Sequence, residues 1–294
     1  MEGYVATIGM FDGVHRGHQF VLRQVVQTSV RRRLGSMVVT FDGGGASKAL
    51  LTPLDRKLAL IAQTGVERTE VLTFSDELRR MTARQFMEQV LQRQFNVKVL
   101  LTGYDNRFGY NRAEGFDDYV RYGRELGMEV MSLPPADGEG GGQQVSSSCI
   151  RQLLLRGDVS EASRCLGYDY ALRGCVAHGH HIGTGMGFPT ANIVPDSGLQ
   201  LIPASGVYAV RVSSVECGAW GEKRGMMNIG RRPTFDGHDT TLEVHILGLD
   251  ADLYGQHLQV SFVQRLRDER HFETVEALRE QLKRDALQVE QLVK

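Results

Sequence analysis

The sequence predicts a chain of class α/β plus β, with a parallel sheet and helices in its first part and an antiparallel β structure in its second. Strand-like and helical segments alternate up to about residue 165, and this alternation is typical of βαβ units. From about residue 172, short β-like segments follow one another with glycine and proline turns between them and no helices. This second pattern indicates an antiparallel barrel or sandwich.

The first part contains short runs of β-branched and aliphatic residues that we predict to be strands. They are Tyr4–Ile8, Ser36–Phe41, Thr69–Phe74, Val97–Thr102 and Glu129–Leu133. Helical patterns lie between them, for example Ala83–Leu91. In that pattern the side chains of Phe86, Val90 and Leu91 share one side. Because ligands of parallel sheets bind beyond the carboxyl ends of the strands, we expect a site just after Ile8.

The second part contains shorter β-like segments and a final helix. The β-like segments are Gly174–Ala177, Gly206–Val212, Gly225–Ile229, Thr241–Leu247 and Leu258–Phe262. Thr274 is suited to cap the final helix. Its apolar stripe consists of Val275, Leu278, Leu282, Ala286, Val289 and Val293. We expect this stripe to face the core.

The composition is that of an ordinary globular protein, with 294 residues and a net charge of −1. Bulk charge gives no reason to expect a nucleic-acid or membrane partner. The four cysteines form no C-x-x-C pair, so we expect free thiols in a reducing compartment. No apolar run reaches the roughly 18 residues that span a bilayer, and the chain starts with a strand. We therefore expect a cytoplasmic protein; its oligomeric state stays open.

A glycine-rich turn, Gly9–His18, joins the first strand to a helical pattern. His15 and His18 stand where that helix begins, and the unpaired N–H groups and positive dipole end of a helix start favour phosphate. Two imidazoles three residues apart can donate to the same oxyanion, so this segment is predicted to hold a nucleoside triphosphate. The alternatives are that the histidines only cap the helix, or that they bind zinc, for which no further Cys or His pair at metal spacing follows.

A second polar segment follows the predicted loop Pro134–Gly142. Three consecutive serines, of which Ser146 and Ser147 are the first two, are followed closely by Arg151 and open the helical pattern Ile150–Leu155. Serines at a helix start are ordinary N-caps. Together with the arginine they can equally bind phosphate oxygens.

Two segments of the second part suggest phosphoryl chemistry. Gly183–Asn192 combines three glycines with Thr190 and Asn192, whose oxygens are hard ligands suited to Mg²⁺ beside phosphates; a glycine-rich β-turn is the alternative. Glu243 and His245 share one face of a predicted strand, where Glu243 is either a base or a surface residue. The sequence contains no P-loop, dinucleotide fingerprint or nucleophile elbow.

Taken in order along the whole chain, these segments resemble the bacterial bifunctional riboflavin kinase/FMN adenylyltransferase family, also called FAD synthetases. The resemblance is carried by Ile8–His18, Gly103–Gly109 with Gly115, Ser146–Arg151, Gly187–Asn192, Asn228–Phe235, Glu243–His245, Leu253–Gly255 and Leu266–Arg267. It implies a Rossmann-like nucleotidylyltransferase domain, a parallel sheet with helices, over residues 1–167. It implies a riboflavin kinase domain, a small antiparallel β-barrel with a terminal helix, over residues 168–294.

The resemblance also implies the activity. The C-terminal domain would phosphorylate riboflavin to FMN with ATP, and the N-terminal domain would adenylylate FMN to FAD with release of pyrophosphate. ATP would be a substrate of both reactions and Mg²⁺ their cofactor. The expected partners are therefore riboflavin, FMN, FAD and ATP, without nucleic acid or membrane.

The candidate site residues follow from the residue types together with the resemblance. Glu243 is the candidate base of the kinase, and His15, His18 and Arg151 are the candidate catalytic residues of the adenylyltransferase. The expected ATP-binding residues are Gly9, Phe11, Asp12, Gly17, Ser146, Ser147, Gly187, Thr190 and Asn192. The expected flavin-binding residues are Asp105, Arg107 and Arg267, and the expected metal ligands are Thr190 and Asn192.

The sequence departs from the family pattern in several places. Gly43–Gly45 replaces the usual Pro-His-Pro, Met10 a common Asn, Ser148 a Thr, and Thr184–Gly185 an Arg-Thr. The triple glycine removes an imidazole and stiffness from a loop near the adenylyltransferase site. One alternative is therefore a riboflavin kinase whose adenylyltransferase domain is weakened or inactive. The others are a flavin sensor without turnover and a nucleotidylyltransferase for another substrate.

Overall fold

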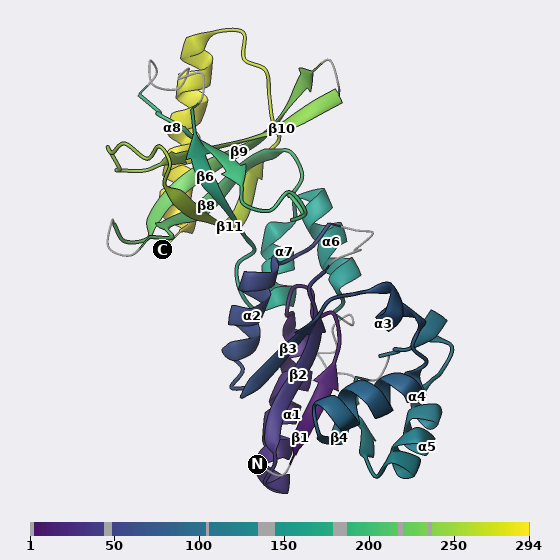
Figure 1. The fold of residues 1–294 in the computed structure, drawn as a ribbon. Coiled ribbons are helices and arrows are strands. Elements are labelled where there is room, and N and C mark those ends of the chain that lie inside the picture. Colours follow the sequence, from purple (N-terminus) through teal and green to yellow (C-terminus); the bar gives the residue numbers. More distant parts are fainter. Residues whose placement is uncertain are drawn as a thin grey trace. The chain divides into compact units, whose positions relative to one another are not determined.

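The structure is a computed structural model that describes residues 3–43, 49–103, 106–134, 145–178, 187–216, 220–234 and 237–293. For residues 231–234 and 237–239 it describes the backbone alone. The chain forms two compact units, Met1–Ser147 and Ser148–Lys294, which we describe separately. Figure 1 shows a sheet with helices in the first and a barrel with a long final helix in the second.

The first unit is built on a five-stranded parallel sheet with the order β3-β2-β1-β4-β5. Its strands are β1 (Tyr4–Ile8), β2 (Gly35–Phe41), β3 (Arg68–Leu72), β4 (Val97–Thr102) and β5 (Glu129–Ser132). The predicted strands are all present, but β3 ends before Phe74. The reason is a turn in which Ser75 N–H bonds the Thr73 carbonyl at 2.8 Å, after which the Ser75 side chain caps a helix.

Helices cover both faces of this sheet. They are α1 (Arg16–Arg32), α2 (Leu54–Ala62), α3 (Asp76–Arg80), α4 (Ala83–Phe86), the π-helix η1 (Met87–Gln94), the short 3₁₀ helix η2 (Tyr110–Arg112) and α5 (Phe116–Leu126). Successive side chains of the central strand β1 alternate between the two faces. Val5 packs with Val25 of α1, whereas Ala6 packs with Phe86 and Tyr119 on the other side.

The helix predicted over Ala83–Leu91 is present but is not one continuous α-helix. It is α-helical only as far as Phe86, and η1 continues it with wider turns, so that Phe95 N–H bonds the Val90 carbonyl at 3.1 Å. The predicted apolar face is confirmed, because Phe86, Val90 and Leu91 are all buried.

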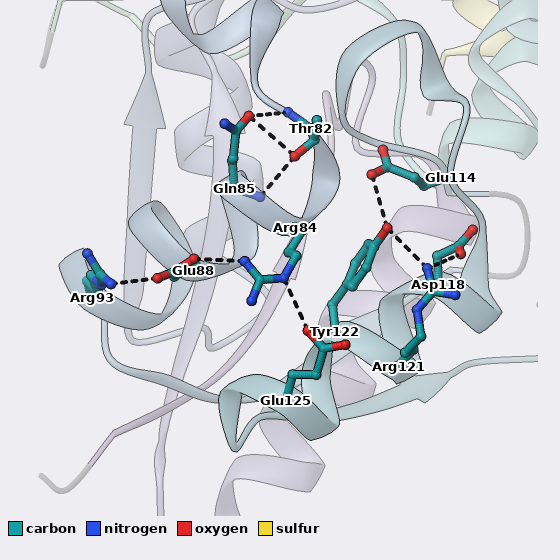
Figure 2. A network of polar contacts seen from close by, with 10 residues as sticks. All are labelled: Thr82, Arg84, Gln85, Glu88, Arg93, Glu114, Asp118, Arg121, Tyr122 and Glu125. Carbon is teal, nitrogen blue, oxygen red and sulfur yellow. Dashed lines mark hydrogen bonds and ion pairs between the residues drawn. The ribbon is translucent and has the colours of Figure 1, made fainter.

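Surface charges join α4, η1 and α5 (Figure 2). Arg84 contacts both Glu88 and Glu125, and Arg93 also contacts Glu88. The side chains of Arg84 and Arg93 are 45% and 69% exposed, and such exposed ion pairs typically contribute about 0–1 kcal/mol each. The buried apolar face therefore holds these helices on the sheet more than their surface charges do.

The second unit contains a closed antiparallel barrel with the order β10-β7-β6-β11-β8-β9. Its strands are β6 (Ala171–Ala177), β7 (Ala191–Pro195), β8 (Gly206–Ser214), β9 (Lys223–Thr234), β10 (Gly237–Ile246) and β11 (His257–Arg267). Its helices are α6 (Ser147–Arg156), α7 (Val159–Leu166) and α8 (Val275–Leu292), of which α6 begins at the last residue of the first unit. The predicted class is thus confirmed, and of the two predicted alternatives, barrel and sandwich, the structure shows the barrel.

The barrel core follows the alternation of its strands. In β11, Leu258, Val260 and Phe262 are fully buried while their neighbours are partly exposed. One strand, β7, was not predicted, because it is short and follows a glycine-rich sequence. A second correction concerns α8, whose stripe does not begin at Val275. That residue is 58% exposed in the capped first turn, and burial on the barrel is complete only toward the end of the helix, at Val289.

Candidate active sites

The first motif, Gly9–His18, forms a tight turn between β1 and α1. Gly9 N–H bonds the Val39 carbonyl at 3.1 Å and so continues the pairing of β1 with β2. After it, Phe11 and Val14 have positive φ angles of 48° and 34°. Side chains, and β-branched ones above all, rarely adopt this conformation. The turn is therefore strained, and the surrounding structure must hold it.

Hydrogen bonds from a neighbouring segment hold this turn. The Asp12 carboxylate accepts from the backbone N–H groups of Leu51 and Thr52, with shortest distances of 2.9 and 3.2 Å. The Thr52 hydroxyl accepts from Gly13 N–H at 3.1 Å, and the Ser147 hydroxyl donates to the Asp12 carbonyl at 2.9 Å. Asp12 thus has a structural role that the sequence did not reveal, beside the expected one in binding ATP.

The two histidines stack on each other where α1 begins. Their ring centroids are 3.6 Å apart, and the His15 side chain caps α1 by accepting from His18 N–H. Burial lowers the pKa of His15 to about 4. Burial, and then the charges of His15 and Lys57, lower the pKa of His18 well below its usual value. Both rings are therefore neutral at pH 7, and they offer hydrogen bonds rather than charge.

Other predicted ATP-binding residues lie around these rings. The Phe11 ring meets His18 edge-on at 5.2 Å. A Cβ at Gly17 would lie 3.3 Å from the His15 ring, so the absence of a side chain at Gly17 allows the ring to occupy this position. Within the described residues, the Nδ1 atom of His18 is buried and has no hydrogen-bond partner. A polar atom in this state is suited to a ligand that supplies the missing partner.

The segment predicted to contact flavin is anchored to the end of β1. The Asn106 amide donates to the Ile8 carbonyl at 2.6 Å, and the Tyr119 hydroxyl bonds both the N–H and the carbonyl of Phe108. Arg107 lies between these anchors and is exposed. The other expected flavin residue of this segment, Asp105, lies outside the described residues.

The serine–arginine segment belongs to both units. Ser147 bonds the first motif as described above, and Ser146 before it is exposed. Arg151 lies in α6, within the second unit. Its approach to the histidines therefore stays a prediction.

In the barrel, strand register brings the predicted kinase residues together. Glu243 of β10 is paired directly with Asn192 of β7, and both are partly buried. Directly paired residues have Cβ atoms about 4.5–5.5 Å apart and lie on the same face. Thr190 precedes β7 and is exposed, as is Gly187 with its φ of 81°. The candidate base and the candidate metal ligand Asn192 thus lie on neighbouring strands, and Thr190 lies directly before one of them.

His245 contacts the segment that contains Thr190 through a hydrogen bond and a ring contact. Its Nδ1 lies 2.7 Å from the Pro189 carbonyl oxygen, and its ring meets Phe188 at 5.1 Å. Because a carbonyl only accepts, Nδ1 carries the proton in this bond. The shared face of Glu243 and His245 therefore contacts the glycine-rich segment at two points.

Arg267, expected to bind flavin, is held by an ion pair. Its guanidinium contacts the Asp285 carboxylate of α8 at 2.8 and 2.9 Å, and Gln281 also donates to that carboxylate. Both ionic side chains are at most 10% exposed. The arginine is thus fixed in place, and its contact with flavin stays a prediction.

Neither a metal cluster nor a membrane helix appears in the part of the chain that the structure describes. There, no group of three or more His, Cys, Asp and Glu side chains could hold a metal ion. No helix of the same residues is long and apolar enough to cross a membrane. The zinc alternative for His15 and His18 thus has no further ligands among the described residues.

Sequence reasoning missed several residues of the first site. Thr52, Lys57 and Asn106 all bond the backbone of the first motif or of the strand before it. They come from segments 39 to 98 residues away in the chain, so no local spacing connected them with the first motif, although Asn106 lies in the segment Gly103–Gly109 that carries part of the resemblance. For Thr52 and Lys57 the signal was the residue type alone, since a hydroxyl can accept from an N–H and an ammonium can donate to a carbonyl.

Comparison with known proteins covers nearly the whole chain. Residues 1–149 match the family model described as FAD synthetase, and residues 166–293 match that described as riboflavin kinase. The bifunctional riboflavin kinase/FMN adenylyltransferase of Escherichia coli (strain K12) is 37% identical, over 97% of this chain and 91% of that protein. Its counterpart from Pseudomonas fluorescens is 35% identical over the same shares. A crystal structure described as a macrolide-efflux protein from Streptococcus pneumoniae has a TM-score of 0.87 and 31% identity, covering 97% of this chain and 93% of that one.

Proposed function

The chain belongs to the bifunctional riboflavin kinase/FMN adenylyltransferase family, and from this premise we propose which residues carry each of its two reactions. The enzyme phosphorylates riboflavin to FMN and adenylylates FMN to FAD, as the resemblance implied. ATP is the expected second substrate of both reactions.

We assign riboflavin phosphorylation to Glu243 and its neighbours. The 5′-hydroxyl oxygen of riboflavin attacks the γ-phosphorus, its proton passes to the Glu243 carboxylate, and ADP leaves. Catalysis of phosphoryl transfer consists mainly of positioning and charge stabilisation. The observation that supports this assignment is the direct pairing of Glu243 with Asn192.

Mg²⁺ fits the oxygens of Thr190 and Asn192. Mg²⁺ usually keeps several waters and is bound by few protein oxygens together with substrate phosphates. A hydroxyl and an amide oxygen beside ATP match this preference, and no carboxylate cluster that would hold a metal by itself occurs among the described residues. When bound, the ion would neutralise charge on the ATP phosphates.

We assign adenylyl transfer to the first motif. A phosphate oxygen of FMN attacks the α-phosphorus of ATP, the bond to the bridging oxygen breaks, and pyrophosphate leaves. The FMN phosphate is already anionic, so no strong base is needed. His15 and His18 are neutral and would donate N–H groups to the phosphates, together with Ser146, Ser147 and Arg151. The support is the stacked histidine pair where α1 begins, at the carboxyl end of β1.

One incubation tests both assignments. The protein is supplied with ATP, Mg²⁺ and either riboflavin or FMN, and the flavins are separated by chromatography. Glu243→Gln should stop FMN formation and leave FAD formation from supplied FMN, because losing a general base typically costs about 10²–10⁴-fold. His18→Ala should do the reverse, with a loss of about 10²–10³-fold. If both activities fell together at unchanged thermal stability, the assignment to two sites would be wrong.

The expected flavin contacts of Asp105, Arg107 and Arg267 belong to this proposal, as does the cytoplasmic location. The alternative of a kinase with a weakened adenylyltransferase rests on Gly43–Gly45, of which only Gly43 lies within the described residues. Gly43 has a φ of 83°, and the proline ring excludes that conformation. The backbone at this point therefore differs from any loop that begins with the usual Pro-His-Pro.

A further inference from the structure

A buried lysine of α2 donates a hydrogen bond to the backbone of the first motif. Lys57 is only 4% exposed. Its ammonium donates to the Phe41 carbonyl at 2.5 Å and to the Met10 carbonyl at 3.2 Å. Lysine is rarely buried so fully unless its charge is paired. The burial of this side chain therefore requires an explanation beyond ordinary packing.

The two carbonyls lie at the edge of the sheet where ligands bind. Met10 opens the strained turn that leads to the histidines, and Phe41 is the last residue of β2. Thr40 also donates to the Met10 carbonyl, at 3.2 Å. The ammonium thus connects the carboxyl ends of β1 and β2, the two neighbouring strands at this edge.

The ammonium also supplies positive charge beside the histidines. Burial lowers the pKa of Lys57, while the neighbouring carboxylates of Asp12 and Asp42 raise it. Its charge reaches His18, where it helps to lower the pKa of that ring. Since both rings are neutral at pH 7, they cannot themselves supply the charge that a triphosphate calls for.

We propose that Lys57 is a positioning residue for adenylyl transfer, which holds the turn of the first motif against the end of β2 and places a positive charge behind its two histidines. This inference rests on the proposed assignment of FAD synthesis to the first motif. Without the ammonium, the carbonyls of Met10 and Phe41 lose a donor and the strained turn can relax. A displacement of catalytic groups by about 1 Å can cost about 10²-fold in rate.

The test compares three lysine variants of the full chain, each assayed for both activities. Lys57→Met keeps the length of the side chain but removes charge and donors, and Lys57→Gln restores a donor without charge. Lys98→Met is the matched control, because Lys98 is exposed near the amino end of β4. His18→Ala is assayed beside them. The kinase activity of each sample is the internal reference.

Lys57→Met is expected to lower kcat of FAD synthesis from FMN about tenfold to a hundredfold, with a smaller change in KM for ATP. Riboflavin phosphorylation should stay unchanged, and Lys98→Met should change neither activity. Lys57→Gln should recover part of kcat, because it restores a hydrogen-bond donor. If the loss in Lys57→Met came from a general structural defect, kcat would not depend on whether residue 57 can donate. NMR titration of Lys57→Met should also show a raised His18 pKa.

Three outcomes would overturn the inference. If Lys57→Met keeps the kcat of FAD synthesis while His18→Ala loses it, Lys57 has no positioning role and the site assignment stands. If His18→Ala also keeps it, the assignment of the reaction to this motif is itself wrong. If Lys57→Met does not fold, Lys57→Gln decides, and a folded Gln variant with full kcat contradicts the proposal.

Discussion

Acidification should destabilise the first unit through His15. The pKa of this ring is about 4 in the folded protein, against 6.5 for an unperturbed histidine side chain. Between these pH values the unfolded chain binds a proton that the folded one does not, so the free energy of unfolding falls as pH falls. The difference of about 2.5 pKa units corresponds to about 3 kcal/mol, at roughly 1.36 kcal/mol per unit. This loss should begin near pH 6.5 and be complete near pH 4.

His15→Asn is the matched comparison, because asparagine can still cap α1 while it cannot titrate in this range. Urea unfolding followed by circular dichroism, repeated at half-unit steps of pH, gives the free energy of unfolding of both proteins. Their difference cancels the contribution of other groups. The wild type should lose about 3 kcal/mol more than the variant between pH 7 and pH 4.

NMR titration of the His15 ring gives its pKa directly. A midpoint near 6.5, or identical pH profiles of the two proteins, would refute the reasoning. Addition of ATP should raise the midpoint, because a bound anion favours the protonated ring.

Other variants test the loop, the flavin segment and the barrel. Gly44→His restores the usual imidazole and leaves the positive φ of Gly43 undisturbed. It should lower KM of FAD synthesis about twofold to fivefold, because the loop then loses less entropy when it orders on binding. If steady-state kinetics showed a rise in kcat alone, the imidazole would instead take part in the transition state. Tyr119→Phe should destabilise the first unit by about 1–3 kcal/mol in thermal unfolding, because it leaves buried backbone groups unpaired, whereas the more exposed Tyr122→Phe should have little effect. Asp285→Ala should cost about 3–5 kcal/mol by leaving the Arg267 charge buried and unpaired; equal urea midpoints for variant and wild type would contradict this.

Much of the first site could be predicted because its signals are local. The alternation of apolar residues in β1, the glycines after it and the helical spacing from Gln19 onward all lie within about 30 residues. His15 and His18 were therefore placed at the start of a helix from the sequence alone, and the structure confirms that position. Their neutrality was not predictable, since it results from burial and from Lys57, which is 39 residues away from His18 in the chain.

The second site shows where such reasoning stops. Glu243 and Asn192 were each identified by residue type, yet their direct pairing depends on the register of β10 against β7. A shift by one residue would place Glu243 on the opposite face of the sheet. The stripe of α8 is a similar case, because periodicity predicted an apolar face without showing that Val275 lies beyond its contact with the barrel.

The sequence by itself determined the class of each part, the strands and helices with strong periodicity, and the family through motifs in a fixed order. These features depend on neighbours a few residues apart, whose side chains repeat at the period of a strand or a helix. Only the tertiary structure decided which groups meet: the Lys57 ammonium with the Met10 carbonyl, Asn106 with Ile8, Glu243 with Asn192. Such contacts depend on strand order, register and burial, which arise when distant segments pack into one core.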